Sequence, residues 1–374
     1  MSPQALEQDH PARIAIRAFL TEFQNPTGRQ LADAGYVVPH WPKPYGLDAD
    51  PRAQLIIDEE LRAAGVRRPI NPIGIGWAGP TLLAGGSVEQ QQRYLPGLLS
   101  GEDFWCQLFS EPDAGSDLSA LRTTAVKDGE EFIVNGSKIW TSYGHIARYG
   151  ILLARTDPQA EQHQGISYFV CPMDLPGITI RPLVDMTGDH AFNEVFFQDV
   201  RIPADCLVGE LHRGWTLAKV TLMNERVSLS GEGALWGRGP TVNDLLELVH
   251  RDPRPLELAL RRRLVDVVIE ARVLAMLRER LVGTVLAGRK VGPEASIRKA
   301  LADEHGQHVM ELAVDLAGLA GQLRGFGPHG DRESDALGWS HGFLYSQALT
   351  IGGGTKAVQR NIIAERILGL PRDA

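Results

Sequence analysis

The chain has 374 residues, of which 43% are hydrophobic and 22% are charged. That length exceeds what one hydrophobic core usually serves, so we expect several subdomains in an otherwise ordinary globular protein. A formal net charge of −8 at pH 7 argues against a protein that binds nucleic acid or anionic membranes, because both need a basic surface.

No apolar run approaches the roughly 20 residues that a membrane-spanning helix needs, and the polar N-terminus lacks the apolar core of a signal peptide. The three cysteines, Cys106, Cys171 and Cys206, have no metal-ligand spacing and cannot all pair with one another. We therefore expect a cytoplasmic protein with reduced thiols and no metal site.

Residues 1–103 are predicted to form an α-helical domain. Apolar residues recur at helical spacing near Ile14, between Leu55 and Leu61, and between Val88 and Leu99. The segment from Pro39 to Gly46 contains too many prolines for a helix and is expected to be a loop.

Residues 104–212 are predicted to form a β-domain, either a small barrel or a sandwich. Runs rich in β-branched and aromatic residues, bounded by Pro, Gly and Asp, cover residues 149–154, 166–171, 178–184 and 193–197. Another run begins at Glu131 and reaches the dipeptide Asn135-Gly136, which is typical of a two-residue hairpin turn. We therefore expect a hairpin turn at Asn135-Gly136.

Residues 213–374 are predicted to form a C-terminal four-helix bundle. Segments of helical length and period cover residues 215–230, 256–287, 294–319 and 356–368, and a Pro/Gly-rich loop at 325–330 interrupts them. Helices, then strands, then helices describe an α+β chain whose two classes of element are segregated.

Two stretches of the predicted β-domain suit a flat ligand. The first, LFSEPDAGSD from Leu108 to Asp117, contains Pro112 and a Gly-Ser turn, and its small residues let a planar group lie close to the backbone. The second, KIWTS, offers the aromatic face of Trp140 beside the hydroxyl group of Ser142. Together they suit a heteroaromatic ring with a polar edge and a phosphate-bearing tail.

With a third motif, these stretches resemble the acyl-CoA dehydrogenase family over essentially the whole chain. FSEPDAGSD is similar to the family's first signature, and KIWTS is similar to its Lys-x-Trp segment. The segment IGGGTKAVQRNIIAERILGLPR, from Ile351 to Arg372, resembles its C-terminal signature. Three motifs in the family's order are far more specific than any one of them.

The resemblance implies FAD as the only cofactor, held between the β-domain and the C-terminal bundle. It also implies desaturation of an acyl thioester and transfer of the electrons to a further acceptor. Carried over by position, the cofactor-binding residues would be Gln107, Leu108, Phe109, Ser110, Gly115, Ser116, Trp140, Thr141, Ser142, Gly354 and Thr355. Ser116 would also lie near the phosphopantetheine of the substrate.

Taken alone, several of these residues have simpler interpretations. Trp140 would be a core tryptophan and Ser116 a turn serine. For Glu111 and Asp117 we prefer a role in capping the loop, because acidic groups beside a pyrophosphate would repel it.

The same resemblance indicates the catalytic base. Many family members place a catalytic Glu before the Gly-Thr pair of the C-terminal motif, where this chain has Gly353. A second subgroup, which includes isovaleryl-CoA and long-chain enzymes, carries that Glu on a bundle helix just before an Arg, which matches Glu225 and Arg226. We therefore assign Glu225 as the base, although alone it would be interpreted as a solvated helix charge.

Two further roles follow from the resemblance. The backbone N–H of Gly353 would bind the thioester oxygen as enolate charge develops. Arg226 would lie on the substrate side, where it orients the loop or supports Glu225.

Two family segments are altered in this chain. The Arg-x-x-Phe-Gly segment, which reaches the FAD of a neighbouring subunit, is missing from residues 231–255, although Arg238 or Arg278 would be a substitute. A later Gln-x-x-Gly-Gly-x-Gly segment is replaced by residues 315–321, which begin with Asp315. We therefore expect an oligomer, and consider a heteromer in which a related chain supplies the missing Arg.

The residues leave alternatives open. A flavin-holding structural subunit of a heteromeric dehydrogenase, or an oxidase or desulfinase on the same fold, would share these motifs, because fold does not fix reaction. Acyl length, branching, the electron acceptor, and the choice between CoA and an acyl-carrier protein are equally open.

Overall fold

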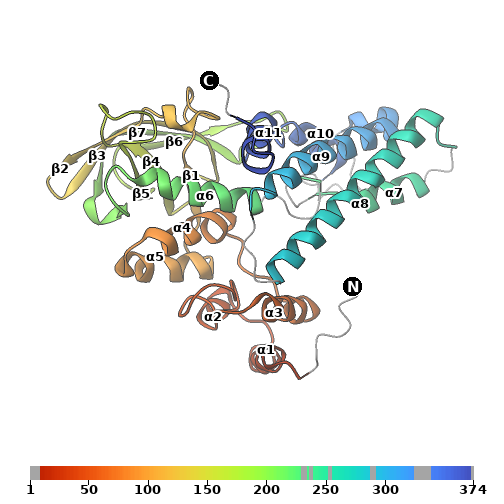
Figure 1. The fold of residues 1–374 in the computed structure, drawn as a ribbon, viewed down its shortest axis with the longest axis horizontal. Coiled ribbons are helices and arrows are strands. Elements are labelled where there is room, and N and C mark those ends of the chain that lie inside the picture. Colours follow the sequence, from red (N-terminus) through yellow and green to blue (C-terminus); the bar gives the residue numbers. More distant parts are fainter. Residues whose placement is uncertain are drawn as a thin grey trace. The chain divides into compact units, whose positions relative to one another are not determined.

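The computed structural model describes residues 9–228, 234–235, 239–251, 255–286, 292–323 and 338–371. The chain divides into two compact units, Met1–Leu183 with His190–Thr221 and Val184–Asp189 with Leu222–Ala374. Figure 1 shows their elements in chain order. None of the described helices combines the length and apolar composition that crossing a membrane requires.

The first unit begins with helices whose starts are marked in the sequence. They are α1 Pro11–Glu22, α2 Gly28–Asp33, α3 Pro51–Ala63, α4 Gly79–Gly85 and α5 Val88–Ser100. The side chains of Thr27 and Ser87 form capping boxes that satisfy free N–H groups at the starts of α2 and α5. Arg17 of α1 donates to the carboxylate of Glu60 in α3 over 2.8 Å, which joins these two helices. The predicted helical character is confirmed.

The strands of the first unit form one eight-stranded sheet. They are β1 Trp105–Leu108, β2 Thr124–Asp128, β3 Glu131–Ser142, β4 Tyr149–Arg155, β5 Ile166–Pro172, β6 Ile178–Leu183, β7 Phe192–Pro203 and β8 Leu207–Val208. The order is β6-β7-β3-β2-β4-β5-β8, and β1 pairs in parallel with β4. Alternating side chains such as Val134, Phe169 and Val195 are fully buried and build the core.

The hairpin turn predicted at Asn135-Gly136 is wrong. Strand β3 runs straight through this dipeptide, and the chain turns earlier, between Asp128 and Glu131, where β2 pairs with β3. Asn135 instead exchanges side-chain hydrogen bonds with Asp199 of β7, beside an irregularity in the β3–β7 register. Gly136 is needed there because a Cβ atom would lie 2.5 Å from the hydroxyl oxygen of Thr123. Tertiary packing, and not a turn, explains this glycine.

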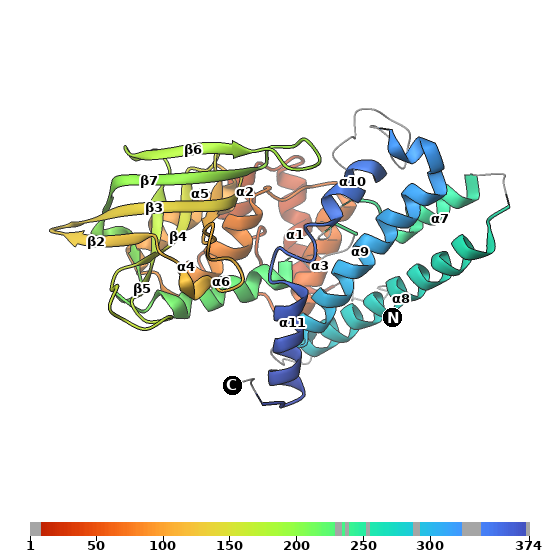
Figure 2. The same cartoon turned by 90° about the horizontal axis from the view of Figure 1, so that it is seen from above.

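The second unit is helical. It contains the end of α6 Gly214–Ser228, then α7 Val242–Arg251, α8 Leu258–Leu286, α9 Ala295–Ala317, α10 Trp339–Ser346 and α11 Lys356–Ile362. Helix α9 packs against α7, α8, α10 and α11, and Figure 2 shows α8 running alongside α9. Leu245, Met310 and Trp339 are fully buried in the core of this unit. The predicted C-terminal bundle is confirmed, and the loop at 325–330 lies outside the described residues.

Candidate active site

The loop after β1 is closed on itself by Glu111. The backbone N–H of Glu111 and that of Ala114 each donate to the other residue's carbonyl, over 3.0 and 3.1 Å. The Glu111 carboxylate accepts from the backbone N–H groups of Arg122 and Thr123 over 2.6 and 2.9 Å. The capping role expected for Glu111 is therefore confirmed.

Lys138, which was not predicted as a site residue, is the centre of this part of the site. It is fully buried, and its ammonium group donates to Glu111 Oε1 over 2.7 Å and to the carbonyl of Phe109 over 3.0 Å. The backbone N–H of Ile139 donates to the carbonyl of Ser110 over 2.9 Å. Strand β3 thus fixes the backbone of the loop that was predicted to carry the ligand.

Burial is the largest single influence on the pKa of each member of this pair. It lowers the pKa of Lys138 to about 8, although the charge of Glu111 acts in the opposite direction. Burial also acts to raise the pKa of Glu111, but the charge of Lys138 and the N–H donors together lower it. The sequence did hold a signal for the burial of Lys138, since this residue lies on the strand face that also carries the buried Phe132 and Val134.

Trp140 is presented to solvent and is not a core residue. Its side chain is 58% exposed, and its backbone has a φ of +60°, a left-handed conformation that is unusual for a residue other than glycine. A register shift between Lys138 and Thr141 breaks the ladder with β7 at this point, and Phe192 packs edge-to-face against the indole. A kinked strand that exposes an indole suits stacking on a flat ligand.

Two buried polar atoms beside Trp140 lack hydrogen bonds within the described residues. Thr141 and Asn193 are fully buried, and Thr141 Oγ1 and Asn193 Oδ1 contact no partner there. The other amide atom of Asn193, Nδ2, donates to the carbonyl of Thr141 over 3.0 Å. Buried polar atoms are nearly always hydrogen-bonded, so a ligand is expected to supply the partners that these two atoms lack. The polar edge of a bound cofactor would do so.

The remaining residues predicted for the cofactor differ in exposure. Gln107, Ser110 and Ser142 are partly buried, whereas Gly115 and Ser116 are exposed in the loop after β1. All of them belong to the first unit, together with Trp140 and Thr141. The fit of this set to FAD rests on the exposed indole and the two unpaired buried atoms.

The second unit contains the predicted base. Glu225 lies in α6 and is 7% exposed, so it is not the solvated helix charge that its residue type alone suggests. The carboxylate is therefore largely shielded from water. The side chain of Arg226 and the whole of Arg238 lie outside the described residues.

The second unit also contains the glycine loop, residues 351–355, between α10 and α11. Gly353 and Gly354 have φ values of +67° and +93°, which glycine adopts without a steric penalty. Thr355 then caps α11, its hydroxyl group accepting from the N–H of Val358 over 3.3 Å. The residues predicted for the site therefore fall into two sets, one in each unit.

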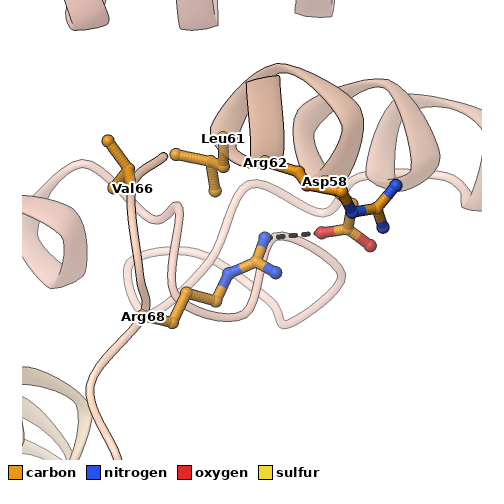
Figure 3. A pocket seen from close by; sticks show the side chains of 5 residues that line it. All are labelled: Asp58, Leu61, Arg62, Val66 and Arg68. Carbon is orange, nitrogen blue, oxygen red and sulfur yellow. Dashed lines mark hydrogen bonds and ion pairs between the residues drawn. The ribbon is translucent and has the colours of Figure 1, made fainter. Parts of the chain in front are cut away.

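Two hollows lie on the first unit. Figure 3 shows one of about 320 Å³ beside α3, where Arg68 points toward Asp58 and donates to it over 2.6 Å. It contains none of the predicted site residues. The other, of about 410 Å³, is lined by Glu111, Pro112 and Ser137 among others, and so borders the loop after β1. Among the described residues no cluster of His, Cys, Asp and Glu could hold a metal ion.

Comparison with protein families gives three matches in chain order. The model "Acyl-CoA dehydrogenase, N-terminal domain" matches residues 8–102, the middle-domain model of the same family matches residues 106–200, and its C-terminal-domain model matches residues 212–368. Together these models cover nearly the whole chain.

Curated relatives agree with these matches. The acyl-CoA dehydrogenase FadE34 of Mycobacterium tuberculosis is 43% identical over 91% of this chain, which spans only 46% of that protein. The acyl-CoA dehydrogenase IpdE1 of Mycobacterium tuberculosis is 37% identical, over 92% of this chain and 88% of that protein.

Solved structures give the same picture. The Tcur3481-Tcur3483 steroid ACAD has a TM-score of 0.76 and 29% identity, covering 96% of this chain and 97% of that one. The ChsE4-ChsE5 complex from Mycobacterium tuberculosis has a TM-score of 0.76 and 29% identity, with both chains covered in full.

Proposed function

This chain belongs to the acyl-CoA dehydrogenase family of flavin-dependent oxidoreductases that act on CH–CH groups, and we propose that it desaturates an acyl-CoA thioester between C2 and C3. The observation that carries this proposal is the burial of Glu225 at the position of a family base, in a chain with Gly353 at the alternative position. A buried carboxylate favours turnover over a purely structural role.

The residues of the second unit perform the proton chemistry in this proposal. Glu225 removes the C2 proton, for which a desolvated carboxylate is well matched. The backbone N–H of Gly353 donates to the thioester oxygen and stabilises the enolate charge that develops there. Arg226 remains a predicted contact on the substrate side.

The residues of the first unit hold the cofactor in this proposal. FAD, when bound, supplies the acceptor for the hydride that leaves C3. Trp140 would stack near its ring system, the segment from Gln107 to Ser110 would lie along it, and Ser142 would donate near its polar edge. Thr141 Oγ1 is the buried atom that such a ligand would satisfy. Gly354 and Thr355 remain predicted contacts of the same cofactor.

We further propose that the acyl group carries a bulky ring system. The support is a structural relative, which is described as a steroid ACAD. The test is the rate at which each of a panel of acyl-CoA thioesters, with steroid, branched or straight chains, bleaches the flavin. We expect the steroid thioesters to react fastest. A clear preference for straight chains would contradict this substrate class.

We also propose a heteromer with a related chain. Two structural relatives are described as pairs of different chains. Helix α8 has a stripe of exposed apolar side chains along one side. With a turn of 100° per residue, they lie within an arc of roughly 80° around the helix axis: Leu258, Val265, Ile269, Val273 and Met276. Exposed Arg262 and Arg280 lie within the same arc, and exposed Arg272 and Asp266 each lie about 20° outside one of its edges. An exposed apolar stripe of this kind suits packing against a helix of a partner chain.

One experiment tests both the activity and the assembly. The chain is purified alone and co-expressed with a related chain, and its mass and visible spectrum are measured. Substrate is then added without oxygen. We expect flavin absorbance that bleaches on addition of acyl-CoA, and loss of assembly in Ile269→Asp but not in the exposed control Lys127→Asp. A colourless protein that takes up no FAD in either state would refute the activity, and a stable flavin-loaded homo-oligomer would refute the heteromer.

A further inference from the structure

Gln359 is a fully buried residue of α11 that holds the glycine loop through its side-chain amide. Its Nε2 donates to the carbonyl of Gly353 over 3.2 Å and to that of Gly354 over 3.1 Å. Carbonyl oxygens only accept hydrogen bonds, so the Gln359 atom that contacts both of them must be the amide nitrogen. One neutral side chain thus fixes two successive peptide groups.

Fixing these carbonyls also fixes the direction of the N–H groups. A trans peptide is planar and points its C=O and N–H to opposite sides. With the carbonyls of Gly353 and Gly354 turned toward Gln359, the N–H groups of Gly354 and Thr355 must point away from it. Within the described part of the chain, the N–H groups of Gly353 and Gly354 donate to no protein acceptor. The loop therefore offers oriented donors on the side opposite Gln359.

The chain entering the loop is held separately from α9. Lys299 is fully buried, pairs with Asp303 over 2.5 Å and donates to the carbonyl of Leu349 over 3.1 Å. Gln307, also in α9, donates to the carbonyl of Ser346 over 3.2 Å. These contacts precede the glycines, so they fix where the loop begins. Gln359 alone among these side chains contacts the carbonyls of Gly353 and Gly354.

We propose that Gln359 is a positioning residue for the proposed desaturation: by holding the carbonyl of Gly353 it fixes in place the residue whose N–H is directed at the thioester oxygen. This inference rests on the proposed function. Donors aimed at developing charge are effective because they need no reorganisation during the reaction. Glycine peptides without the Gln359 amide would sample many orientations, so the loss falls on the chemical step more than on substrate binding.

The test uses the flavin-loaded protein, with its partner chain if one is required, and a readout that does not depend on hydride transfer. The probe is a 3-thia-acyl-CoA, which has sulfur in place of C3 and cannot yield a hydride. Exchange of its C2 protons in D₂O, followed by mass spectrometry, measures proton abstraction alone. The variants are Gln359→Met, which keeps the length but removes the donor, and the matched control Gln307→Met.

We expect Gln359→Met to slow C2 exchange and kcat by roughly 10²-fold with KM changed little, as for a misplaced catalytic group. Gln307→Met should change both rates less than about threefold, because its amide does not contact the two glycine carbonyls. Amide deuterium exchange should accelerate in residues 349–356 of Gln359→Met only. Exchange at the wild-type rate in Gln359→Met would overturn the positioning role and leave the proposed function intact. A wild-type protein that exchanges no C2 proton would overturn both.

A second variant keeps the test decisive if Gln359→Met does not fold. Gln359→Glu keeps the size, and its carboxyl group can donate one hydrogen bond only when it is protonated. The exchange rate of Gln359→Glu, relative to wild type, should therefore rise as pH falls. A ratio independent of pH would contradict the donor role of the Gln359 amide.

Discussion

The two sets of predicted site residues, one in each unit, hold their backbones by different chemistry. In the first unit a charged side chain, Lys138, binds the carbonyl of Phe109 and is itself neutralised by Glu111. In the second unit a neutral side chain, Gln359, binds the carbonyls of two glycines. Both side chains are fully buried. We call the Lys138–Glu111 ion pair the ionic clamp and the Gln359 side chain the amide clamp. The ionic clamp depends on pH and on both of its charged side chains. The amide clamp does not titrate and needs no second side chain.

The difference matches the proposed roles of the two sets. The first set of residues has to receive a large cofactor, and a rigid strand with a buried ion pair provides a fixed platform for it. The second set has to stabilise charge that appears only during the reaction, and neutral donors respond to that charge without titrating themselves. Mutations in the first set should therefore reduce stability and flavin content, whereas mutations in the second set should reduce the rate of the reaction.

The largest expected effect is on the proton chemistry of the second unit. Glu225→Gln keeps the shape and removes the basicity, so flavin content should remain normal. Reduction of the flavin by substrate should slow by roughly 10²–10⁴-fold, the usual range for a positioned base. Anaerobic stopped-flow spectroscopy measures this rate. Bleaching at a near-normal rate would show that another group is the base.

The next effect concerns the ionic clamp. Lys138→Met leaves Glu111 buried without its cation, and breaking a buried ion pair in this way costs roughly 3–5 kcal/mol of folding stability. Flavin content should fall together with the free energy of unfolding in denaturant. Lys127→Met, on the exposed part of β2, is the matched control and should change little. A stable, fully loaded Lys138→Met would show that the platform does not need its ion pair.

A smaller effect should appear with pH. The pKa of Glu111 is lowered in the fold from its ordinary value of 4.5, so the folded protein binds its proton less readily than the unfolded chain. The contribution of Glu111 to the free energy of unfolding is therefore fully present above pH 4.5. It is lost as the pH falls toward the pKa of Glu111 in the folded protein, by up to about 1.4 kcal/mol per pH unit. The free energy of unfolding of Glu111→Gln, measured against wild type, should lack this component. Parallel pH profiles would contradict the ionic clamp.

Local sequence signals predicted much of this fold. Apolar residues at helical spacing predicted α1, α3 and α5, near Ile14, between Leu55 and Leu61, and between Val88 and Leu99, because this spacing lies within one helix. Long periodic segments predicted α8 and α9 for the same reason. The hairpin at Asn135-Gly136 failed because a local turn preference was outweighed by packing against Thr123 and pairing with Asp199.

The site was predicted less completely because its geometry depends on distant residues. Lys138 and Glu111 are 27 residues apart, and no local pattern pairs them. The exposure of Trp140 depends on a register shift against β7, and a tryptophan in a strand is otherwise expected in the core. Gln359 was part of a recognised motif, but its contact with the glycine carbonyls became visible only in the folded loop.

The smallest expected effect separates backbone strain from positioning. Gly65 and Gly354 both have positive φ values, +68° and +93°, so alanine at either should cost about 1–2 kcal/mol of stability. A Cβ atom at Gly65 meets nothing within 4 Å, whereas at Gly354 it would lie 2.7 Å from Gln359 Nε2.

Gly65→Ala should therefore lose stability and keep its kcat, because only the conformational penalty applies to it. Gly354→Ala should lose more stability than Gly65→Ala, and kcat should fall as well, because the new methyl group displaces the buried amide that holds the loop. Denaturant unfolding and steady-state kinetics on both variants measure the two effects separately. Equal kcat values in the two variants would mean that the glycine loop tolerates displacement of Gln359, and that the amide clamp contributes to folding alone.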